Sequence, residues 1–383
     1  MLLAGLRVLD LSRVLAGPLC TMLLGDLGAD VLKVERPGAG DDTRGWGPPF
    51  DARGESAYFL SVNRNKRSLA ADLARADDVG LLRALIADAD VVVDNFRPGL
   101  LARCGLAPDA LLAAYPRLVW CTISGFGPDS PRPGYDFVVQ AECGWMAING
   151  EPAGAPMRAG VAFVDVVTGK DAAIAILAAL VARGRDLLPV AARHLHVSLA
   201  ASAAAALVNV AQNALVSGQD AGRWGNAHPN LVPYQLFDAA DRALVLAVGN
   251  DAQWRACARV LGRADLGDDP RLATNAGRVT HRVEVVAAVA ERLARRPAVE
   301  WLARFDAAGV PAGLVRTVLE TLTAVDASPL TGVAPSVPGT VRLPPPTLDA
   351  DGARVRARGW GAFAADAAGV VGHIDAAQRV KTP

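Results

Sequence analysis

The chain has 383 residues, of which 52% are apolar and 20% are charged, so it can bury the cores of two domains and is not expected to be disordered. Lysine plus arginine and aspartate plus glutamate each total 39, and this balance gives no field that would attract nucleic acid or an anionic membrane. The five cysteines lack a C-x-x-C pair, which argues against a disulfide framework or a zinc site and favours a reducing compartment. No signal peptide is predicted, because MLLAGLRVLDL passes directly into a strand pattern, and we expect a cytoplasmic protein.

The first 125 residues alternate between strand-like and helix-like patterns. Short apolar runs indicate buried parallel strands, and the helix after the first strand has Pro18 in its first turn and Gly28 near its end. This order predicts an open, mostly parallel sheet with helices on both faces, which is an α/β fold. The predicted elements are strands at 7–11, 31–35, 91–96 and 118–127, with helices at 17–30 and 78–89 and a further helix before the last strand.

The carboxyl ends of these strands form the edge where ligands of such sheets bind, and this sequence gathers cations there. The turn after the first strand is not G-x-G-x-x-G, so the dinucleotide fingerprint is absent. Arginines at strand ends favour a phosphate group, and we expect a nucleotide-containing ligand other than NAD. Asp10 and Glu35, also at strand ends, either bind a ribose or stabilise the loops. The cations are Arg36, Arg97 and Arg103, with Arg64, Lys66 and Arg67 between them.

The stretch 161–184, VAFVDVVTGKDAAIAILAALVARG, carries the candidate catalytic residue Asp165. Its small and β-branched start suits an extended entry, and Thr168 with Asp171 is typical of a capping box that begins a helix. Asp165 then lies just outside the cap, near the positive end of the helix, where a carboxylate stays ionised and can attack an electrophile. The alternative is that Asp165 is a second, redundant cap.

The second half of the chain differs from the first in composition and in the order of its predicted elements. An uncharged, Ala-rich run at 197–217 follows a strand and indicates a buried helix, since its Ser, Asn and Gln content makes a poor membrane anchor. The Gly/Pro/Asn-rich stretch 218–234 is typical of a domain boundary or an active-site loop. A smaller domain is predicted from a hairpin-like strand at 237–250, helices at 251–262 and 283–308, and a return strand at 309–317. A Pro-rich extended tail follows at 335–347, and we expect it to wrap a surface of this chain or of a partner.

Several sequence blocks occur together and in order across essentially the whole chain. They are GLRVLDLSRVLAGPLCTMLLGDLGADVLKVERPGAGDDTRGWGPP (5–49), NRNKRSLAADL (63–73), DNFRPG (94–99), GYDFVVQA (134–141), the Asp165 segment and residues 224–254. In this combination the chain resembles the class III CoA-transferases, which include formyl-CoA and carnitine CoA-transferases and, as a divergent branch, α-methylacyl-CoA racemase.

The resemblance implies an architecture that topology rules do not suggest. Two chains, each with a Rossmann-like large domain and a smaller α/β domain, interlock as a ring-like homodimer, and the C-terminal segment returns to the large domain. The implied division is a large CoA-binding domain at 1–195, a linker helix at 196–222, a small domain at 223–317 and a C-terminal segment at 318–383.

The resemblance also implies the chemistry of Asp165. In the family, the matching aspartate attacks an acyl-CoA thioester to form a mixed anhydride and free CoA thiolate. The thiolate returns to give an aspartyl-CoA thioester, from which the acceptor acid takes the CoA, so covalent catalysis divides one exchange into easier steps. Coenzyme A and acyl-CoA are thus expected as substrates, with no permanently bound cofactor and no metal, and succinyl-CoA is a reasonable donor.

The resemblance further assigns a CoA site by position. Leu15 and Ala16 would line the pantetheine path, and Arg36 would meet the nucleotide. Gly134, Tyr135 and Asp136 would lie between CoA and the acyl group. The adenine and ribose wall would be Ala71, Asp72, Leu73 and Ala74, and Asn95, Phe96, Arg97 and Arg103 would complete the site.

The chain departs from the family pattern at three points. A lysine frequent in the family is absent near Ala74, which displaces or removes one phosphate contact. Leu15 replaces the glutamine of formyl-CoA transferases, and the glycine-rich loop of their small domain has no counterpart, which argues against formyl-CoA and oxalate as substrates. The racemase histidine is missing from 134–136, which favours acyl transfer over racemisation.

Two rival functions stay open at this point. An acyl-CoA racemase or epimerase would need a second base beside Asp165, and a non-catalytic CoA-binding protein would need no chemistry from it. His228, in the loop Asn226–Asn230, either contacts an acceptor carboxylate or caps the loop.

Overall fold

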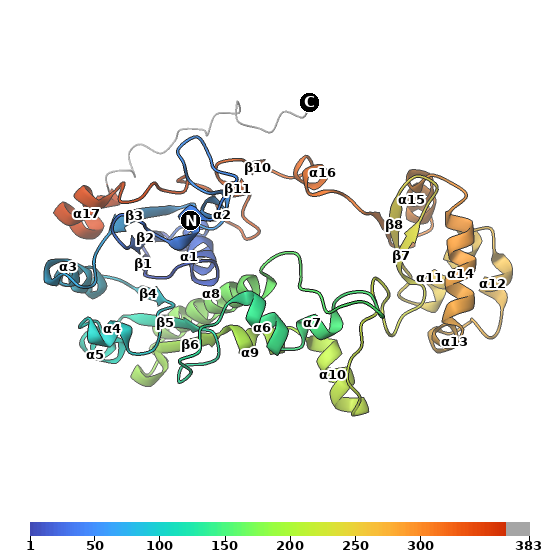
Figure 1. The fold of residues 1–383 in the computed structure, drawn as a ribbon, viewed down its shortest axis with the longest axis horizontal. Coiled ribbons are helices and arrows are strands. Elements are labelled where there is room, and N and C mark those ends of the chain that lie inside the picture. The colour runs from blue at the N-terminus through green and yellow to red at the C-terminus, as the bar shows by residue number, and fades with distance from the viewer. Residues whose placement is uncertain (365–383) are drawn as a thin grey trace. The chain divides into compact units, whose positions relative to one another are not determined.

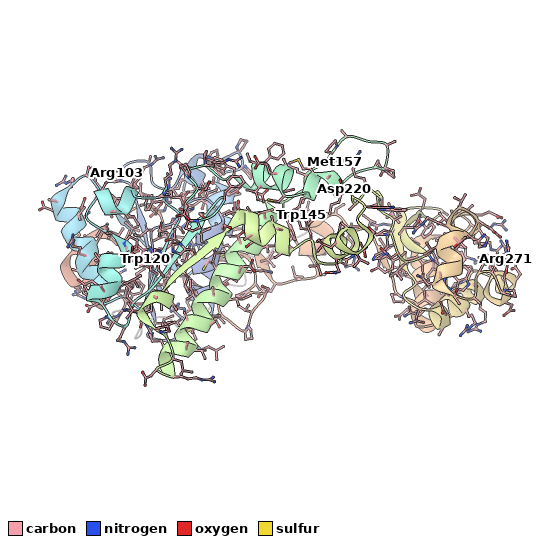
Figure 2. The ribbon with its side chains drawn as sticks, turned by 90° about the horizontal axis from the view of Figure 1, so that it is seen from below. Arg103, Trp120, Trp145, Met157, Asp220 and Arg271 are labelled. Carbon is pink, nitrogen blue, oxygen red and sulfur yellow. The ribbon has the colours of Figure 1, made fainter. Side chains whose placement is uncertain are left out.

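The computed structural model describes residues 1–364, which form two compact units. The first, called the sheet unit, comprises Met1–Trp145, Arg158–Gln219 and the described residues from Leu322 onward. The second, called the small unit, comprises Met146–Met157 and Asp220–Thr321. Figure 2 labels three of the boundary residues, Trp145, Met157 and Asp220. The four-part division expected from the sequence stays a prediction, and residues 365–383 of its last part lie outside the described residues.

Six parallel strands form the centre of the sheet unit, as Figure 1 shows. Their order is β3-β2-β1-β4-β5-β6, which is the order of a doubly wound sheet with its crossover point between β1 and β4. The predicted parallel sheet is therefore confirmed. The strands are β1 (Arg7–Asp10), β2 (Asp30–Glu35), β3 (Lys66–Ala70), β4 (Val91–Asp94), β5 (Val119–Ser124) and β6 (His194–Ser198).

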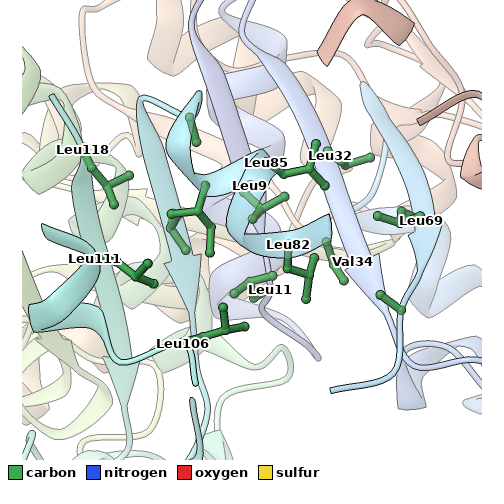
Figure 3. Packing of buried hydrophobic residues seen from close by; sticks show 14 of the residues in the cluster. Leu9, Leu11, Leu32, Val34, Leu69, Leu82, Leu85, Leu106, Leu111 and Leu118 are labelled. Atoms are coloured by element: carbon green, nitrogen blue, oxygen red, sulfur yellow. The ribbon is translucent and has the colours of Figure 1, made fainter. Parts of the chain in front are cut away.

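Both faces of this sheet are buried, because successive side chains along each strand enter opposite cores. On β1, Leu9 packs into one core and Val8 into the other. The first core joins the sheet to α3 (Ala76–Ala87), whose Leu82 and Leu85 pack among the strand leucines in Figure 3. The helices α5 (Pro108–Ala114) and α17 (Gly352–Arg358) add to the same face.

The opposite face is covered by α1 (Ala16–Asp26) and α8 (Phe163–Gly184). The two helices pack closely because Gly169 has no side chain, since a Cβ there would lie 2.6 Å from the carbonyl oxygen of Ala16. This contact fixes the start of α8 against the start of α1. The remaining helices of the sheet unit are η1 (Asp42–Gly45), α2 (Ala57–Ser61), α4 (Leu100–Arg103), α6 (Asp136–Glu142), η2 (Val190–Ala192) and η3 (Gly359–Ala362), and α7 (Trp145–Ile148) crosses a unit boundary.

The Ala-rich run is two helices, and the prediction of one long buried helix at 197–217 was wrong. The helices α9 (Leu199–Ala205) and α10 (Val208–Ser217) meet at a bend of 70°, and no residue of α10 is buried. Within residues 1–364 no single helix has the length and apolarity to cross a membrane, although this bent pair passes that test by length and composition.

The C-terminal segment lies on the sheet unit of its own chain. Within the predicted tail, Asn65 donates to the carbonyl of Thr340 (2.9 Å) and accepts from the N–H of Leu343 (2.9 Å), which confirms that the tail wraps a surface of its own chain. Arg64 donates to the carbonyls of Thr331 (2.9 Å) and Val333 (2.5 Å). Farther on, Asp351 accepts from the N–H of Ser68 (3.1 Å) and Asp349 from that of Ala70 (2.7 Å), both on the outer strand β3. The segment also contains β10 (Ala327–Ser328) and β11 (Gly332–Val333), which pair with each other.

The small unit is built on an antiparallel sheet of β7 (Tyr234–Asp238), β8 (Ala243–Ala247) and β9 (Ala312–Leu314). The predicted strand at 237–250 is the end of β7, a turn and β8, and the helical stretch at 283–308 is two helices. Trp254, Trp301 and Phe305 lie at the centre of its core. The helices are α11 (Asp251–Val260), α12 (Ala264–Asp268), α13 (Asn275–Thr280), α14 (Arg282–Leu293) and α15 (Ala298–Ala307), with α16 (Val318–Leu322) at the boundary.

Candidate active site

A cavity of about 200 Å³ lies in the sheet unit at the carboxyl ends of β1, β4 and β5. This is where a doubly wound sheet binds its ligands, at the point where the strand order reverses. The side chain of Asp165 reaches the same cavity from the first turn of α8. Other lining residues are Arg13, Val14, Leu15, Ala16, Asn95, Phe96, Arg97, Pro98, Ile123, Ser124, Gly125, Ser130, Pro131, Arg132, Pro133, Gly134, Tyr135 and Leu199.

The position of Asp165 differs from the sequence-based expectation. Helix α8 begins at Phe163, so Asp165 lies inside the first turn, and the prediction of a capping box at Thr168 was wrong. Thr168 is buried within the helix and donates its hydroxyl to the carbonyl of Val164 (2.7 Å). Asp171 instead accepts a hydrogen bond from Ser202 of α9 (2.6 Å).

The cap of α8 comes from Asp136, a residue on a different helix. One carboxylate oxygen of Asp136 accepts from the backbone N–H groups of Val164 (2.7 Å) and Asp165 (3.2 Å), which would otherwise lack partners at a helix start. The other oxygen accepts from the side-chain amide of Gln140 (2.6 Å). This tertiary cap explains why the helix begins six residues earlier than its local sequence suggests.

The carboxyl group of Asp165 titrates near neutral pH. Burial, together with the neighbouring charge of Asp136, raises the pKa of Asp165 to about 7. Burial and the charge of Asp136 thus oppose the ionisation of Asp165 that the sequence led us to expect. Burial and the charge of Asp165 also raise the pKa of the nearby Tyr58 to about 12, so this phenol stays protonated.

The turn after β1 forms another wall of the cavity and is held in an unusual backbone conformation. Val14, a β-branched residue, has φ 73°. The N–H of Val14 donates to the carboxylate of Asp41 (3.3 Å), while Asn95 accepts from the N–H of Arg13 (3.0 Å) and donates to its carbonyl (2.7 Å). These contacts clamp the turn that leads into α1, so the cavity wall at Leu15 and Ala16 has a fixed shape.

Several strand-end charges that the sequence suggested for ligand binding are buried in ion pairs. Lys66 lies 3.0 Å from Asp10, and Arg64 lies 2.8 Å from Asp26. Although burial opposes its ionisation, Lys66 and Lys33 hold the pKa of Asp10 at about 2. The loop-stabilising alternative for Asp10 and Glu35 matches this structure. Arg67 pairs with Asp351 and Glu35 with Arg44.

The predicted CoA-binding residues fall into two groups. The first lines the cavity together with Asp165 and comprises Leu15, Ala16, Asn95, Phe96, Arg97, Gly134 and Tyr135. The second lies outside its lining: Arg36 pairs with Asp42, Arg103 is exposed on α4, Ala71, Asp72, Leu73 and Ala74 follow β3, and Asp136 caps α8. Their roles in binding CoA stay predictions.

The loop 130–133 was missed by sequence reasoning, although Arg132 from this loop adds a cation to the cavity wall. Gly134 follows the loop and packs against Gly125, and a Cβ on Gly134 would lie 2.3 Å from the Cα of Gly125. The prolines on both sides of Arg132, directly before the predicted Gly134-Tyr135 pair, were the available signal. The same reasoning missed Arg13, which lies beside the ring of Phe96 at 5.8 Å.

Comparison with known proteins identifies relatives over most of the chain. The model of "CoA-transferase family III" matches residues 3–351. A succinate–glutarate CoA-transferase of Agrobacterium fabrum is 44% identical over 326 residues, covering 83% of this chain and 81% of that protein. A human succinyl-CoA:glutarate CoA-transferase is 42% identical, covering 82% of this chain and 72% of that protein. A CAIB/BAIF family protein from Brucella suis has a crystal structure with a TM-score of 0.80 and 39% identity, covering 93% of this chain and 98% of that one.

Proposed function

This chain belongs to CoA-transferase family III, and we propose that it transfers CoA from succinyl-CoA to a small dicarboxylic acid, with glutarate as the first candidate. The observation that carries the proposal is the position of Asp165 on the wall of a cavity at the crossover point of the sheet. The substrates named for the two relatives above support this choice of donor and acceptor.

The first step of the proposed reaction is attack by a carboxylate oxygen of Asp165 on the thioester carbonyl. A C–O bond forms, the C–S bond breaks, and the negative charge of Asp165 leaves with the CoA thiolate. A carboxylate is a weak nucleophile in water, but this one is partly buried and has a pKa of about 7, which makes it more basic than an exposed aspartate. The first turn of α8, whose backbone N–H at Asp165 donates to Asp136, fixes the backbone position from which the carboxyl group reaches the cavity.

The second step returns the thiolate to the aspartyl carbonyl of the anhydride. A Cγ–S bond forms, the Cγ–O bond breaks, and succinate leaves as a carboxylate. The acceptor acid then attacks the aspartyl thioester, and the thiolate released in that step takes the new acyl group, which restores the Asp165 carboxylate. The cavity wall carries Arg13, Arg97 and Arg132, whose positive charges favour these anionic species.

A panel of donors and acceptors tests the proposed function. We expect succinyl-CoA with glutarate to give glutaryl-CoA and succinate, with a kcat/KM at least tenfold above that for a monocarboxylate of similar length or for oxalate. The products are separated and quantified by chromatography. Substitution of Asp88, an exposed residue at the amino edge of the sheet, by asparagine is the control and should leave the rates unchanged.

The same panel of donors and acceptors also tests the two rival functions. Uptake of solvent deuterium at the α-carbon of an acyl-CoA without CoA exchange would support a racemase. Within residues 1–364, however, no histidine lines the cavity that contains Asp165. CoA binding without any product would support a non-catalytic binding protein and contradict the proposal.

We also propose that two chains form an interlocked homodimer. Apolar side chains lie exposed on α10, where Leu215 is 78% and Val216 is 79% accessible. On α8, Ile174 and Val181 face outward although the helix otherwise packs against the sheet. A monomer would leave these side chains in water, whereas a second copy of the chain would cover them.

We also propose that the protein is cytoplasmic. All five cysteines are free thiols, and Cys20, Cys121 and Cys257 are buried in the cores. This pattern supports a reducing compartment, which cell fractionation would test.

A further inference from the structure

We propose that Asp136 is a positioning residue, which aims Asp165 by holding the first turn of α8 and uses its own negative charge to favour the covalent states of Asp165. This inference rests on the proposed function, since it concerns the aspartyl intermediates of that reaction. It gives Asp136 a role different from the CoA contact that the sequence suggested.

The contacts of Asp136 show how it fixes the nucleophile. It is the first residue of α6, is 8% exposed, and binds the N–H groups of Val164 and Asp165 with one oxygen. Gln140, fully buried one turn later, donates to the other oxygen of Asp136 and accepts from the N–H of Ala159 (2.9 Å). Asp136 and Gln140 therefore hold both the first turn of α8 and the chain that enters it.

The charge of Asp136 is not neutralised by a cation. Its partners are two backbone N–H groups and one amide, and no lysine, arginine or histidine in the described part of the chain forms an ion pair with it. Asp165 therefore carries its own negative charge close to a second one. Repulsion between two carboxylates in a partly buried site disfavours the state in which both are ionised.

Acylation relieves this repulsion in the same way as protonation does. In the anhydride and in the aspartyl thioester, the charge of Asp165 has moved to the thiolate or to the released carboxylate. The free energy by which Asp136 raises the pKa of Asp165 is thus also available to favour covalent attachment. Asp136 makes the free carboxylate less stable and the acylated residue, by comparison, more stable.

Other groups lie around Asp165. Arg13, Arg97 and Arg132 line the same cavity, and the nearby Tyr58 phenol is neutral at physiological pH. Burial of Asp165 opposes ionisation whether or not Asp136 is charged. A change at Asp136 that keeps the oxygen facing α8 but removes the charge tests the effect of repulsion, and it also gives up the second acceptor oxygen, which faces the amide of Gln140.

The test is Asp136→Asn, because the amide oxygen of asparagine accepts the same backbone N–H groups without a charge. The purified protein is mixed with succinyl-CoA at pH 5 to 9, quenched, and the fraction acylated on Asp165 is measured by mass spectrometry of the peptide. In the natural protein we expect the acid limb to have its midpoint near pH 7, the pKa of Asp165. In Asp136→Asn, the midpoint should fall by about one pH unit and the acylated fraction at equilibrium by about tenfold.

Asp136→Ser and Asp88→Asn are the companion variants. Serine keeps a neutral helix cap in a smaller side chain, so it should shift the midpoint in the same direction even if asparagine perturbs folding. Asp88→Asn removes a charge at the amino edge of the sheet and should change neither quantity.

The outcomes separate the two proposals. A folded Asp136→Asn or Asp136→Ser protein with the midpoint and acylated fraction of the natural protein would overturn the role of the Asp136 charge. Absence of any adduct in the natural protein would instead refute the covalent mechanism of the proposed function.

Discussion

At the scale of single residues, the protonation state of Asp165 connects stability with activity. Its pKa of about 7 means that the folded protein holds a proton there between about pH 4 and 7, a range in which the unfolded chain has released it. Folded-state stability from this group is therefore present at low pH and is lost as the pH rises through 7. The residue that the proposed reaction requires in its ionised form is one that the fold holds more easily as a neutral acid.

Asp165→Asn follows from this residue-scale argument. The variant should form no hydroxylamine-sensitive adduct with succinyl-CoA, because an amide is not a nucleophile toward the thioester. Above pH 7 it should be at least as stable as the natural protein to urea, since it avoids ionising a partly buried carboxyl. Peptide mass spectrometry and urea titrations at pH 8 check the two parts. An adduct at another residue, with transfer retained, would contradict the assignment of Asp165.

Sequence reasoning identified Asp165, but it named Asp136 as a CoA contact and not as the cap of the helix. The uncharged Ala/Ile/Leu run after Asp165 indicated a helix, and the family blocks indicated the chemistry of Asp165. The spacing of Thr168 and Asp171 matched a local cap, yet the cap is Asp136, 28 residues before Val164. Local spacing contains no information about a partner from another helix, and here the tertiary contact prevailed.

At the scale of elements, strands made of short apolar runs were predictable because both faces of the sheet are buried, and the predicted strands at 7–11, 31–35, 91–96 and 118–127 lie in the parallel sheet. The outer strand β3, KRSLA, was missed, because its Lys66 and Arg67 were interpreted as cations for a ligand. The break between α9 and α10 was not predictable in this way, because Ala206 and Leu207 are good helix formers and no glycine or proline separates the two helices. The backbone at Val208 has φ 39°, a conformation that nothing in the sequence predicts.

The contact between α1 and α8 gives a prediction at this scale. Gly169→Ala places a methyl group 2.6 Å from the Ala16 carbonyl oxygen, so the helices must separate. We expect a loss of about 1–2 kcal/mol in the free energy of unfolding, because the strain exceeds the roughly 1 kcal/mol gained from helix propensity. Turnover should also fall, since both helices contribute residues to the lining of the cavity.

Gly184→Ala on the same helix is the matched control. A Cβ at Gly184 meets no atom within 4 Å, so stability should stay the same or rise. Urea denaturation of the three proteins gives the comparison. Equal stabilities of Gly169→Ala and Gly184→Ala would show that the two helices do not meet as described.

At the scale of the whole molecule, residues far apart in the sequence share buried charges. Arg44 donates to the carbonyl of Pro346 (3.2 Å), and Arg67 lies 2.7 Å from Asp351. Such partners, about 300 residues apart, follow from no local pattern, which is why Arg67 was counted among the strand-end cations expected to favour a phosphate. The resemblance to a family supplied what the pattern did not, namely the return of the C-terminal segment to the large domain.

The proposed interlocked homodimer gives a prediction at this scale. Gel filtration with light scattering should show a dimer down to nanomolar concentration. Mixed labelled and unlabelled dimers should exchange chains only when denaturant detaches the C-terminal segment, because interlocked chains cannot separate while both are closed. A folded monomer at micromolar concentration, or chain exchange within minutes in buffer, would contradict interlocking.

The outer strand β3 is covered by the carboxylates of Asp349 and Asp351, and this has a consequence for the synthesis of the chain. The N–H groups of Ser68 and Ala70 point away from the sheet and are covered by residues translated some 280 positions later. Until those residues leave the ribosome, the nascent sheet has an open edge that can pair with strands of other molecules. Ribosome stalling or truncation ahead of Asp349 should therefore yield aggregation-prone chains, even though every strand of the parallel sheet has already been made.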